Sequence, residues 1–184
     1  MAAAPFIYSI GHSTRTIDEF LALLETHGIR QIADVRAFPA SRRLPHFNRE
    51  PFAASLAHHG VAYRHMPALG GRRRPRPDSP NDGWREAGFR AYADYMATPE
   101  FSRALDELRE FAAHAPTAVM CAEAVWWRCH RRLIADALVR AGVEVKHILS
   151  AVRAERHEMT PFAVVRGGIL VYPGLLSGGE SSTD

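Results

Sequence analysis

The sequence is short of the features that mark secreted, membrane-spanning and disordered proteins. It holds only two cysteines, whereas small secreted folds usually carry four or more in disulfides. No run approaches the ~18 consecutive apolar residues that a transmembrane helix needs, and the first residues lack a basic segment followed by an apolar one. Apolar residues make up 47% of the chain, too many for wholesale disorder. We therefore expect a soluble, cytoplasmic protein.

Several ligand-binding motifs are absent as well. There is no G-x-G-x-x-G and no G-x-x-x-x-G-K-[ST], so the sequence has no nucleotide-cofactor motif, and the G-x-S-x-G elbow of many hydrolases is missing. The spacing from Cys121 to Arg128 is C-x6-R without a glycine, which does not supply the tight loop of amides that a cysteine phosphatase uses to hold phosphate. For the same reason, Asp34 and Arg36 followed by a later strand-end cysteine give only a weak similarity to rhodanese.

Apolar segments alternate with amphipathic helical segments along the first 150 residues. Strands are expected at 6–10, 29–35, 61–65, 117–120 and 143–149, with a helix at about 126–140 that holds Cys129 and His130 in its first turn. Residues 67–88 are rich in glycine, proline and arginine and are expected to form a long loop. This alternation predicts a single α/β domain over 1–150, doubly wound around a mainly parallel five-stranded sheet, Rossmann-like or flavodoxin-like.

The remaining residues are expected to lie outside this domain. Residues 151–176 form a C-terminal extension, in which 161–165 and 169–172 around Gly167 and Gly168 are compatible with a β-hairpin. Residues 177–184 read as a disordered tail.

Each of the five expected strands ends in, or is followed by, polar or ionisable residues. In an open parallel sheet, ligands bind beyond the carboxyl ends of the strands, where loops and helix starts converge. This convergence is the main argument for a functional site at that edge. The residues concerned are His12 and Ser13, Asp34 and Arg36, His65, Cys121 and Glu123, and His147.

The segment from Cys121 to Arg131 has the pattern C-x-E-x5-C-H-R. A thiol near a helix start and near arginines has a lowered pKa, so a reactive thiolate is expected, with His130 as a base. Each residue also has a structural interpretation: both cysteines and His130 as packed core residues, and Glu123 as a helix cap. Asp34 and Arg36 also have a structural interpretation, as an ion pair at the end of a strand. These alternatives stay open from the sequence alone.

Arginines occur in clusters, which indicates an anionic ligand or a solvated surface. The candidates for anion binding are Arg36, Arg42, Arg72 and Arg131. Trp126 and Trp127 either stack on an aromatic ligand or bury against the proline-rich loop.

A series of motifs in this order resembles the domain of unknown function family 488. They are Ile10 to Arg15, Asp34 to Arg42, Phe47-Asn48, Leu69-Gly70-Gly71-Arg72, Tyr92 to Met96, Met120 to Glu123, Cys129 to Arg132 and His147-Ile148. The resemblance covers about residues 6–150. It implies a compact α/β domain of bacterial and archaeal proteins, with these motif residues as its site and no agreed reaction.

We expect an enzyme, a hydrolase or transferase that uses cysteine and histidine on a small anionic, phosphate-containing or nucleotide-like substrate. Its catalytic residues are predicted to be Cys121, Glu123, Cys129, His130 and His12, and its substrate-binding residues Ser13, Asp34, Arg36, Arg42, Arg72 and Arg131. The first alternative is a nucleic-acid-binding or accessory module without catalysis. The second is a structural zinc domain with Cys121, Cys129, His130 and His12 as ligands, although the spacing matches no known zinc motif and no metal ligand is assigned.

Overall fold

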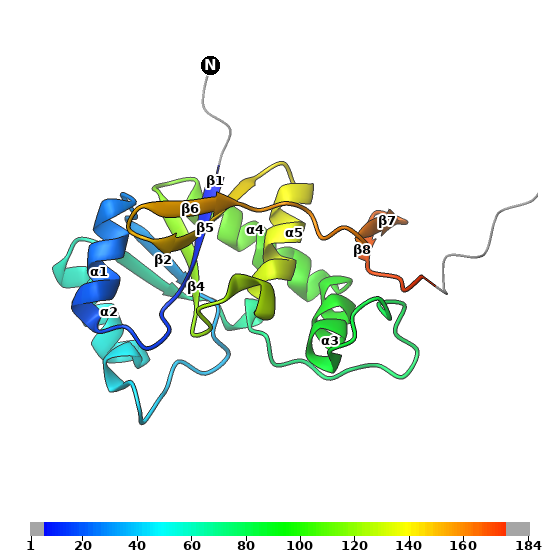
Figure 1. Ribbon diagram of the computed structural model, residues 1–184, viewed down its shortest axis with the longest axis horizontal. Coiled ribbons are helices and arrows are strands. Elements are labelled where there is room, and N and C mark those ends of the chain that lie inside the picture. The colour runs from blue at the N-terminus through cyan, green and yellow to red at the C-terminus, as the bar shows by residue number, and fades with distance from the viewer. Residues whose placement is uncertain (1–5, 176–184) are drawn as a thin grey trace, which may run out of the picture.

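Within residues 6–175, which a computed structural model describes, six strands form one sheet in the order β3-β2-β4-β1-β5-β6 (Figure 1). The first five strands run parallel to their neighbours, and β6 is antiparallel to β5. The strands are β1 (Phe6–Gly11), β2 (Gln31–Asp34), β3 (Ala62–His65), β4 (Thr117–Cys121), β5 (Glu144–Ser150) and β6 (Arg153–Arg156). The predicted parallel α/β sheet is confirmed, with one further strand at its edge.

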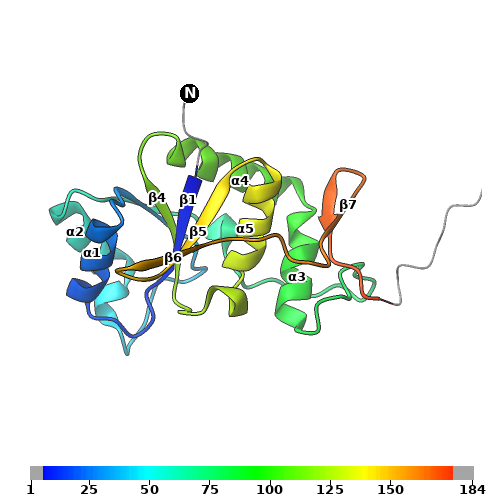
Figure 2. The ribbon, with the colours of Figure 1, turned by 45° about the horizontal axis from the view of Figure 1, so that its top comes forward.

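Helices cover both faces of this sheet, as Figure 2 shows. On one face lie α1 (Ile17–Thr26) and α2 (Arg49–His58), packed in one core cluster; on the other lie α3 (Ala87–Met96), α4 (Pro99–Ala112) and α5 (Arg131–Arg140), packed in a second. Adjacent residues of the central strand β4 belong to different core clusters: Val119 packs with α3 to α5, and Met120 packs with α1 and α2. Successive side chains of a strand point to opposite faces of the sheet, so β4 contributes to both cores. The doubly wound architecture is thus confirmed.

The connections after β1 and β4 leave the sheet toward opposite faces. The chain passes from β1 through α1 to β2, and from β4 through α5 to β5, although β1 and β4 are neighbours. Neighbouring strands whose connections diverge form the topological switch point of a doubly wound sheet, and the crevice there is the usual ligand site of such folds.

The start of α5 differs from the prediction. The expected helix at 126–140 is divided into a short 3₁₀ turn, η3 (Trp126–Arg128), and α5, which begins only at Arg131. Cys129 between them has extended backbone, with φ −123° and ψ 150°, and His130 is the N-cap residue of α5. Cys129 and His130 therefore precede the helix, and the extended backbone directs the Cys129 side chain into the core, where it is 5% exposed.

A C-terminal hairpin of β7 (Val164–Arg166) and β8 (Ile169–Val171) confirms the expected pairing of this region. Its turn is Gly167-Gly168, with φ of +54° and +79°, a conformation that glycine adopts without strain. Tyr172 follows the hairpin and is fully buried, donating its hydroxyl to Asp136 of α5. The predicted tail at 177–184 lies outside the described residues.

Two further 3₁₀ turns, η1 (Pro45–Phe47) and η2 (Pro67–Leu69), lie in the loops after β2 and β3.

None of the helices in the part of the chain that the structure describes has the length and apolar character that crossing a membrane requires.

Candidate functional site

The loops after β1 and β4 run side by side beyond the end of the sheet. The strands pair Gly11 with Cys121, and the pairing continues past the sheet because the amide of His12 donates to the carbonyl of Cys121 at 2.9 Å. The amide of Ser13 donates to Ala122 in the same way at 2.9 Å. Ser13 has a φ of +52°, which is rare for a residue other than glycine. The switch point therefore brings two of the predicted strand ends into direct contact.

Glycine is required at Gly11 for this close approach. A Cβ atom at that position would lie 1.9 Å from the carbonyl oxygen of Glu123, well inside van der Waals contact. The bare backbone of Gly11 thus lets the Glu123 segment cross directly over the end of β1.

A pocket of about 860 Å³ opens at this edge of the sheet. Eight of the predicted site residues line it, and three do not: Asp34, Arg42 and Arg131. Arg42 is exposed on the surface, whereas Asp34 and Arg131 are buried beneath the pocket. The eight predicted residues that line it are His12, Ser13, Arg36, Arg72, Cys121, Glu123, Cys129 and His130.

Two thiols and an imidazole cluster at one side of the pocket. The Sγ atoms of Cys121 and Cys129 and a ring nitrogen of His130 all lie within 4.8 Å of one another. Nδ1 of His130 is 3.5 Å from Sγ of Cys129, and its Nε2 is 3.2 Å from the carbonyl oxygen of Val35. A carbonyl only accepts, so Nε2 carries a proton and the ring directs Nδ1 toward the thiols.

The two thiols differ in acidity. A hydrogen bond from Cys121 holds the pKa of Cys129 well below its usual value, with further stabilisation of the thiolate by His130 and Arg131. The same hydrogen bond, together with burial, raises the pKa of Cys121 well above its usual value. Cys129 is therefore the more acidic thiol of the pair, and Cys121 is the one that donates to it.

Arg131 is part of the framework of the site. It is 2% exposed, and its guanidinium donates to Ser9 Oγ at 3.0 Å, to the carbonyl of Glu123 and to Cys129 Sγ at 3.5 Å. These bonds join β1, the loop after β4 and the segment before α5. Arg131 was predicted from the sequence to bind substrate, but it lies below the pocket and holds Glu123 and Cys129 in place.

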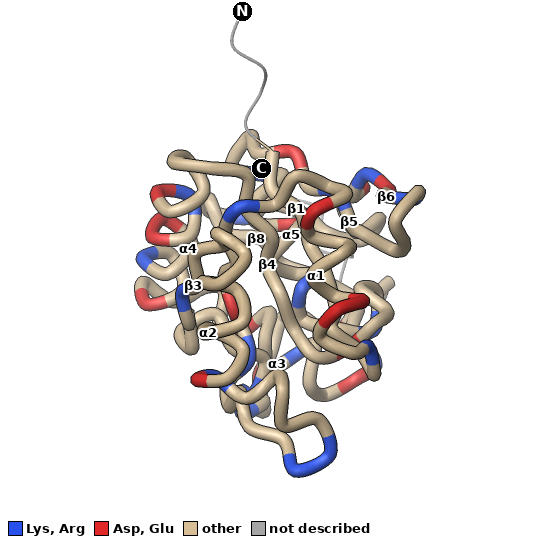
Figure 3. Tube along the Cα trace, turned by 90° about the vertical axis from the view of Figure 1, so that its left-hand side faces the viewer, with Lys and Arg blue, Asp and Glu red and all other residues tan. Residues whose placement is uncertain are grey.

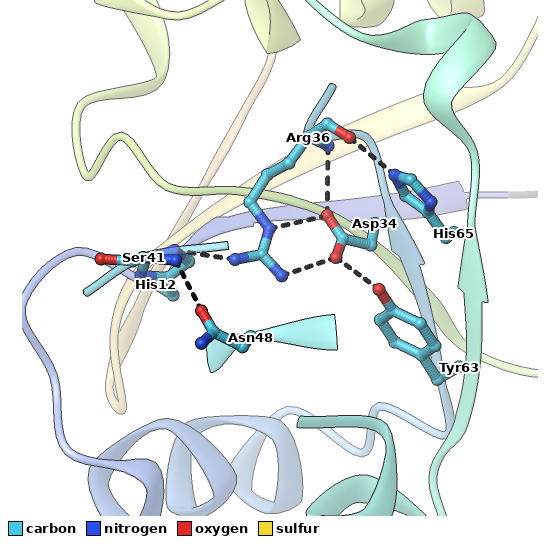
Figure 4. A network of polar contacts seen from close by, with 7 residues as sticks. All are labelled: His12, Asp34, Arg36, Ser41, Asn48, Tyr63 and His65. Carbon is cyan, nitrogen blue, oxygen red and sulfur yellow. Dashed lines mark hydrogen bonds and ion pairs between the residues drawn. The ribbon is translucent and has the colours of Figure 1, made fainter. Parts of the chain in front are cut away.

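Asp34 and Arg36 form the buried ion pair that was one interpretation of the sequence. Arg36 donates Nε and Nη2 to the two carboxylate oxygens at 2.9 and 2.7 Å, and Tyr63 donates its hydroxyl to the same carboxylate at 2.7 Å (Figure 4). His65, at the end of β3, bonds to the carbonyl of Arg36 at 2.8 Å. The carboxylate fixes the guanidinium in a position from which Arg36 still lines the pocket.

His12 is engaged at both ring nitrogens. Its Nδ1 lies 2.8 Å from the carbonyl of Ser13, its Nε2 lies 3.4 Å from Nη1 of Arg36, and the ring stacks on Phe47 at 4.2 Å. Burial, with the nearby Arg36 charge, lowers the pKa of His12 to about 4. The ring is therefore neutral near pH 7, and it supports Arg36.

The two tryptophans have different surroundings. Trp126 stacks on His147 with ring centroids 4.0 Å apart and donates its indole N–H to Glu155 of β6 at 2.6 Å. Trp127 is 47% exposed. Trp126 thus packs against the edge of the sheet formed by β5 and β6.

Some residues of this region were missed by the sequence reasoning. Phe89 and Glu86 line the pocket from the start of α3 and carry no motif that identifies them, whereas Phe38 and Gly71 lie within the quoted motifs. A Cβ atom at Gly71 would lie 2.6 Å from Nδ1 of His130, so this glycine leaves the space that the imidazole occupies.

A family model described as "Domain of unknown function DUF488" matches residues 16–138. The chain belongs to this family. The DUF488 match includes Asp34, Arg36 and the C-x-E-x5-C-H-R segment, and it excludes His12 and Ser13, which lie just before it. No curated protein and no solved structure matches the chain.

Proposed function

We propose that this DUF488 protein is an enzyme that hydrolyses a small phosphate-containing or nucleotide-like anion, or transfers a group from it, in the pocket at the switch point. One observation carries the proposal: a single pocket combines the cluster of Cys121, Cys129 and His130 with the guanidinium groups of Arg36 and Arg72. Its volume of about 860 Å³ is within the range of pockets for small ligands and cofactors.

Arginine supplies the anion recognition in this proposal. Arg36 is held rigidly by Asp34, and only its Nη1 is not bonded to that carboxylate. Arg72 and Arg128 are exposed and line the same pocket, so a ligand there can reach their side chains. Planar guanidinium groups match phosphate oxygens in geometry and charge, which favours a phosphate-containing ligand over a neutral one.

The reacting groups are assigned to the other side of the pocket. Cys129 is the more acidic thiol of the pair, His130 directs its Nδ1 toward that thiol, and Glu123 is exposed in the same pocket. Glu123 acts as the acid–base group because, unlike His12, it has room to contact a ligand. A carboxylate, an imidazole and a thiolate within one cavity are the usual groups of hydrolytic and transfer chemistry.

Ligand binding is tested by calorimetric titration with adenosine monophosphate, inorganic phosphate and, as the matched neutral ligand, adenosine. We expect the two phosphates to bind and adenosine to bind at least ~10-fold more weakly, which corresponds to about 1.4 kcal/mol. Arg72→Ala should weaken phosphate binding, whereas Arg74→Ala, which removes an exposed charge outside the pocket lining, should not. Equal binding of adenosine, or equal effects of the two substitutions, would refute anion recognition here.

Turnover is tested on a panel of nucleotides and phosphate esters, with products separated by chromatography. Cys129→Ser and His130→Ala should remove product formation while circular dichroism and phosphate binding are retained. If both variants unfold, the cluster is structural and the proposed chemistry is wrong.

The nucleic-acid-binding alternative retains one supporting observation, the exposed Trp127 beside the exposed Arg128. Along the Cα trace in Figure 3, the positions of basic and acidic residues are interspersed. Binding to phosphates along a strand must weaken steeply with salt, so a salt-dependent gel shift with single- or double-stranded probes would favour this alternative over the enzyme.

A further inference from the structure

The cluster of Cys121, Cys129 and His130 has the dimensions of a metal site. In tetrahedral coordination, with bonds of about 2.3 Å to sulfur and about 2.0 Å to nitrogen, a sulfur and a nitrogen ligand lie about 3.5 Å apart, and two sulfur ligands about 3.8 Å apart. Sγ of Cys129 and Nδ1 of His130 are separated by 3.5 Å, and no pair among the three ligand atoms exceeds 4.8 Å. Side-chain movements of about 1 Å would therefore complete a site for one ion.

His130 is oriented as a metal-binding histidine is. Such residues donate the second ring N–H to a carboxylate or a backbone carbonyl, which fixes the tautomer and directs the other nitrogen at the ion. Here Nε2 is 3.2 Å from the carbonyl of Val35, and the ring packs against Tyr92 with centroids 5.2 Å apart. Gly71 leaves room for the ring on another side. The imidazole is therefore held with Nδ1 toward the two thiols.

The sulfur of Cys129 also has an outer hydrogen bond. Arg131 donates Nε to it and is itself fixed by Ser9 and by the carbonyl of Glu123. N–H donors to sulfur stabilise a ligating thiolate, and groups of this kind orient the ligands of metal sites. Arg131 thus supports Cys129 in the same way that Val35 supports His130.

We propose that Cys121, Cys129 and His130 bind one thiophilic divalent cation, zinc by the chemistry of the ligands, and that its fourth position opens into the pocket. Two thiolates and one imidazole are ligands that zinc accepts in tetrahedral sites, and three protein ligands with one open position are typical of catalytic centres. His12, the other candidate ligand in the sequence, bonds to Ser13 and Arg36 and is not among the clustered residues. The site is therefore distinct from a closed structural zinc domain.

The reaction assigned to this metal site rests on the proposed function. The metal site in turn explains how the two thiols contribute to that reaction. A water molecule in the fourth position is acidified by the cation and loses a proton to Glu123. Its oxygen forms the new bond to the electrophilic atom of the substrate, such as phosphorus. The bond to the leaving group then breaks, the leaving group keeps the electron pair, and Glu123 returns the proton to it. One water is consumed, and no oxidant or reductant is needed.

The test is a titration of the reduced, chelator-treated full-length protein with cobalt(II) under anaerobic conditions, followed by competition with zinc(II). We expect one equivalent of cobalt to bind, with thiolate-to-cobalt charge-transfer absorbance and the intense visible bands of a four-coordinate ion, and zinc to displace it. Cys121→Ser, Cys129→Ser and His130→Ala should each weaken binding by more than about 100-fold, because loss of outer-shell groups alone costs 10- to 100-fold. His12→Asn, the control, should leave stoichiometry and spectrum unchanged.

The outcomes separate this inference from the proposed function. If reduced wild-type protein binds no cobalt or zinc, or if Cys129→Ser binds cobalt as tightly as the wild type, the metal site is refuted. Turnover of a phosphate substrate by metal-free protein would refute the catalytic role of the cation while leaving the proposed function intact. One bound equivalent with the thiolate spectrum, in a protein that binds no phosphate, would support the metal site and refute the proposed function.

Discussion

Replacing Arg131 by methionine is expected to destabilise the protein substantially. The substitution keeps an unbranched side chain of similar length, but it leaves Ser9 Oγ and the carbonyl of Glu123 without the donors that now bond to them. Each buried polar group left unsatisfied costs about 1–3 kcal/mol, and part of this is offset because a buried charge no longer has to be desolvated. We therefore expect the free energy of unfolding to fall by about 2–4 kcal/mol.

Urea unfolding followed by circular dichroism measures this loss, with Arg128→Met as the matched control. Arg128 carries the same charge three residues earlier and is exposed, so its replacement should change stability by less than about 0.5 kcal/mol. The melting temperature of Arg131→Met should fall by about 4–16 °C. If both substitutions have the same small effect, or if Arg131→Met is more stable than the wild type, Arg131 does not hold this framework together.

Three further predictions concern the histidine on β5 and the glycines of the site. Burial, with the nearby charges of His157 and Arg131, lowers the pKa of His147 to about 3, so the folded protein resists protonation that the unfolded chain accepts below about pH 6.5. As the pH falls below about 6.5, the free energy of unfolding should therefore decrease, by about 2 kcal/mol at pH 5. His147→Asn should remove this part of the pH dependence of stability. An unchanged pH profile in that variant would contradict the prediction. Gly11→Ala should unfold the protein or displace the loop after β4, seen as a lowered melting temperature, and a wild-type melting temperature would contradict it. Gly71→Ala should displace the imidazole it faces and impair turnover with a smaller loss of stability, because the clash is with a side chain; unimpaired turnover would show that this space is not needed.

The order of elements, and the edge of the sheet at which the candidate residues gather, could be predicted because they follow from local patterns. Cys121 follows an apolar run and His12 another, and the rule that ligands bind beyond parallel strands predicts that both lie at one edge. The two loops are in direct contact because β1 and β4 are neighbours, and the sequence patterns do not predict which strands are neighbours.

Arg131 shows how sequence reasoning missed a structural role. Its place in a Cys-His-Arg motif favoured ligand binding, yet it precedes Ile134 and Leu138 by three and seven residues, the spacing of one helix face. Both of these residues are 1% exposed, and Arg131 shares their buried face. The helical spacing therefore indicates that Arg131 is buried, whereas the charge of its side chain favoured an exposed, ligand-binding role.

The edge strand and the network beyond residue 150 could not be read from local patterns. β6 has the sequence Arg-Ala-Glu-Arg, without an apolar face, because charged residues are tolerated at a sheet edge. Asp136 accepts hydrogen bonds from His157 at 2.8 Å and from Tyr172 at 2.9 Å. These residues are 21 and 36 positions away in the sequence, and only the packing of the C-terminal extension on α5 brings them together.

The central claim, that the pocket at the switch point recognises a phosphate-containing anion, is tested most directly by crystallography with a heavy phosphate analogue. Crystals soaked in tungstate should show an anomalous peak inside the pocket, within hydrogen-bond distance of Arg36 or Arg72. The Arg72→Ala protein should show a weaker peak under the same conditions. A pocket without a peak, together with peaks on surface arginines elsewhere, would contradict the account.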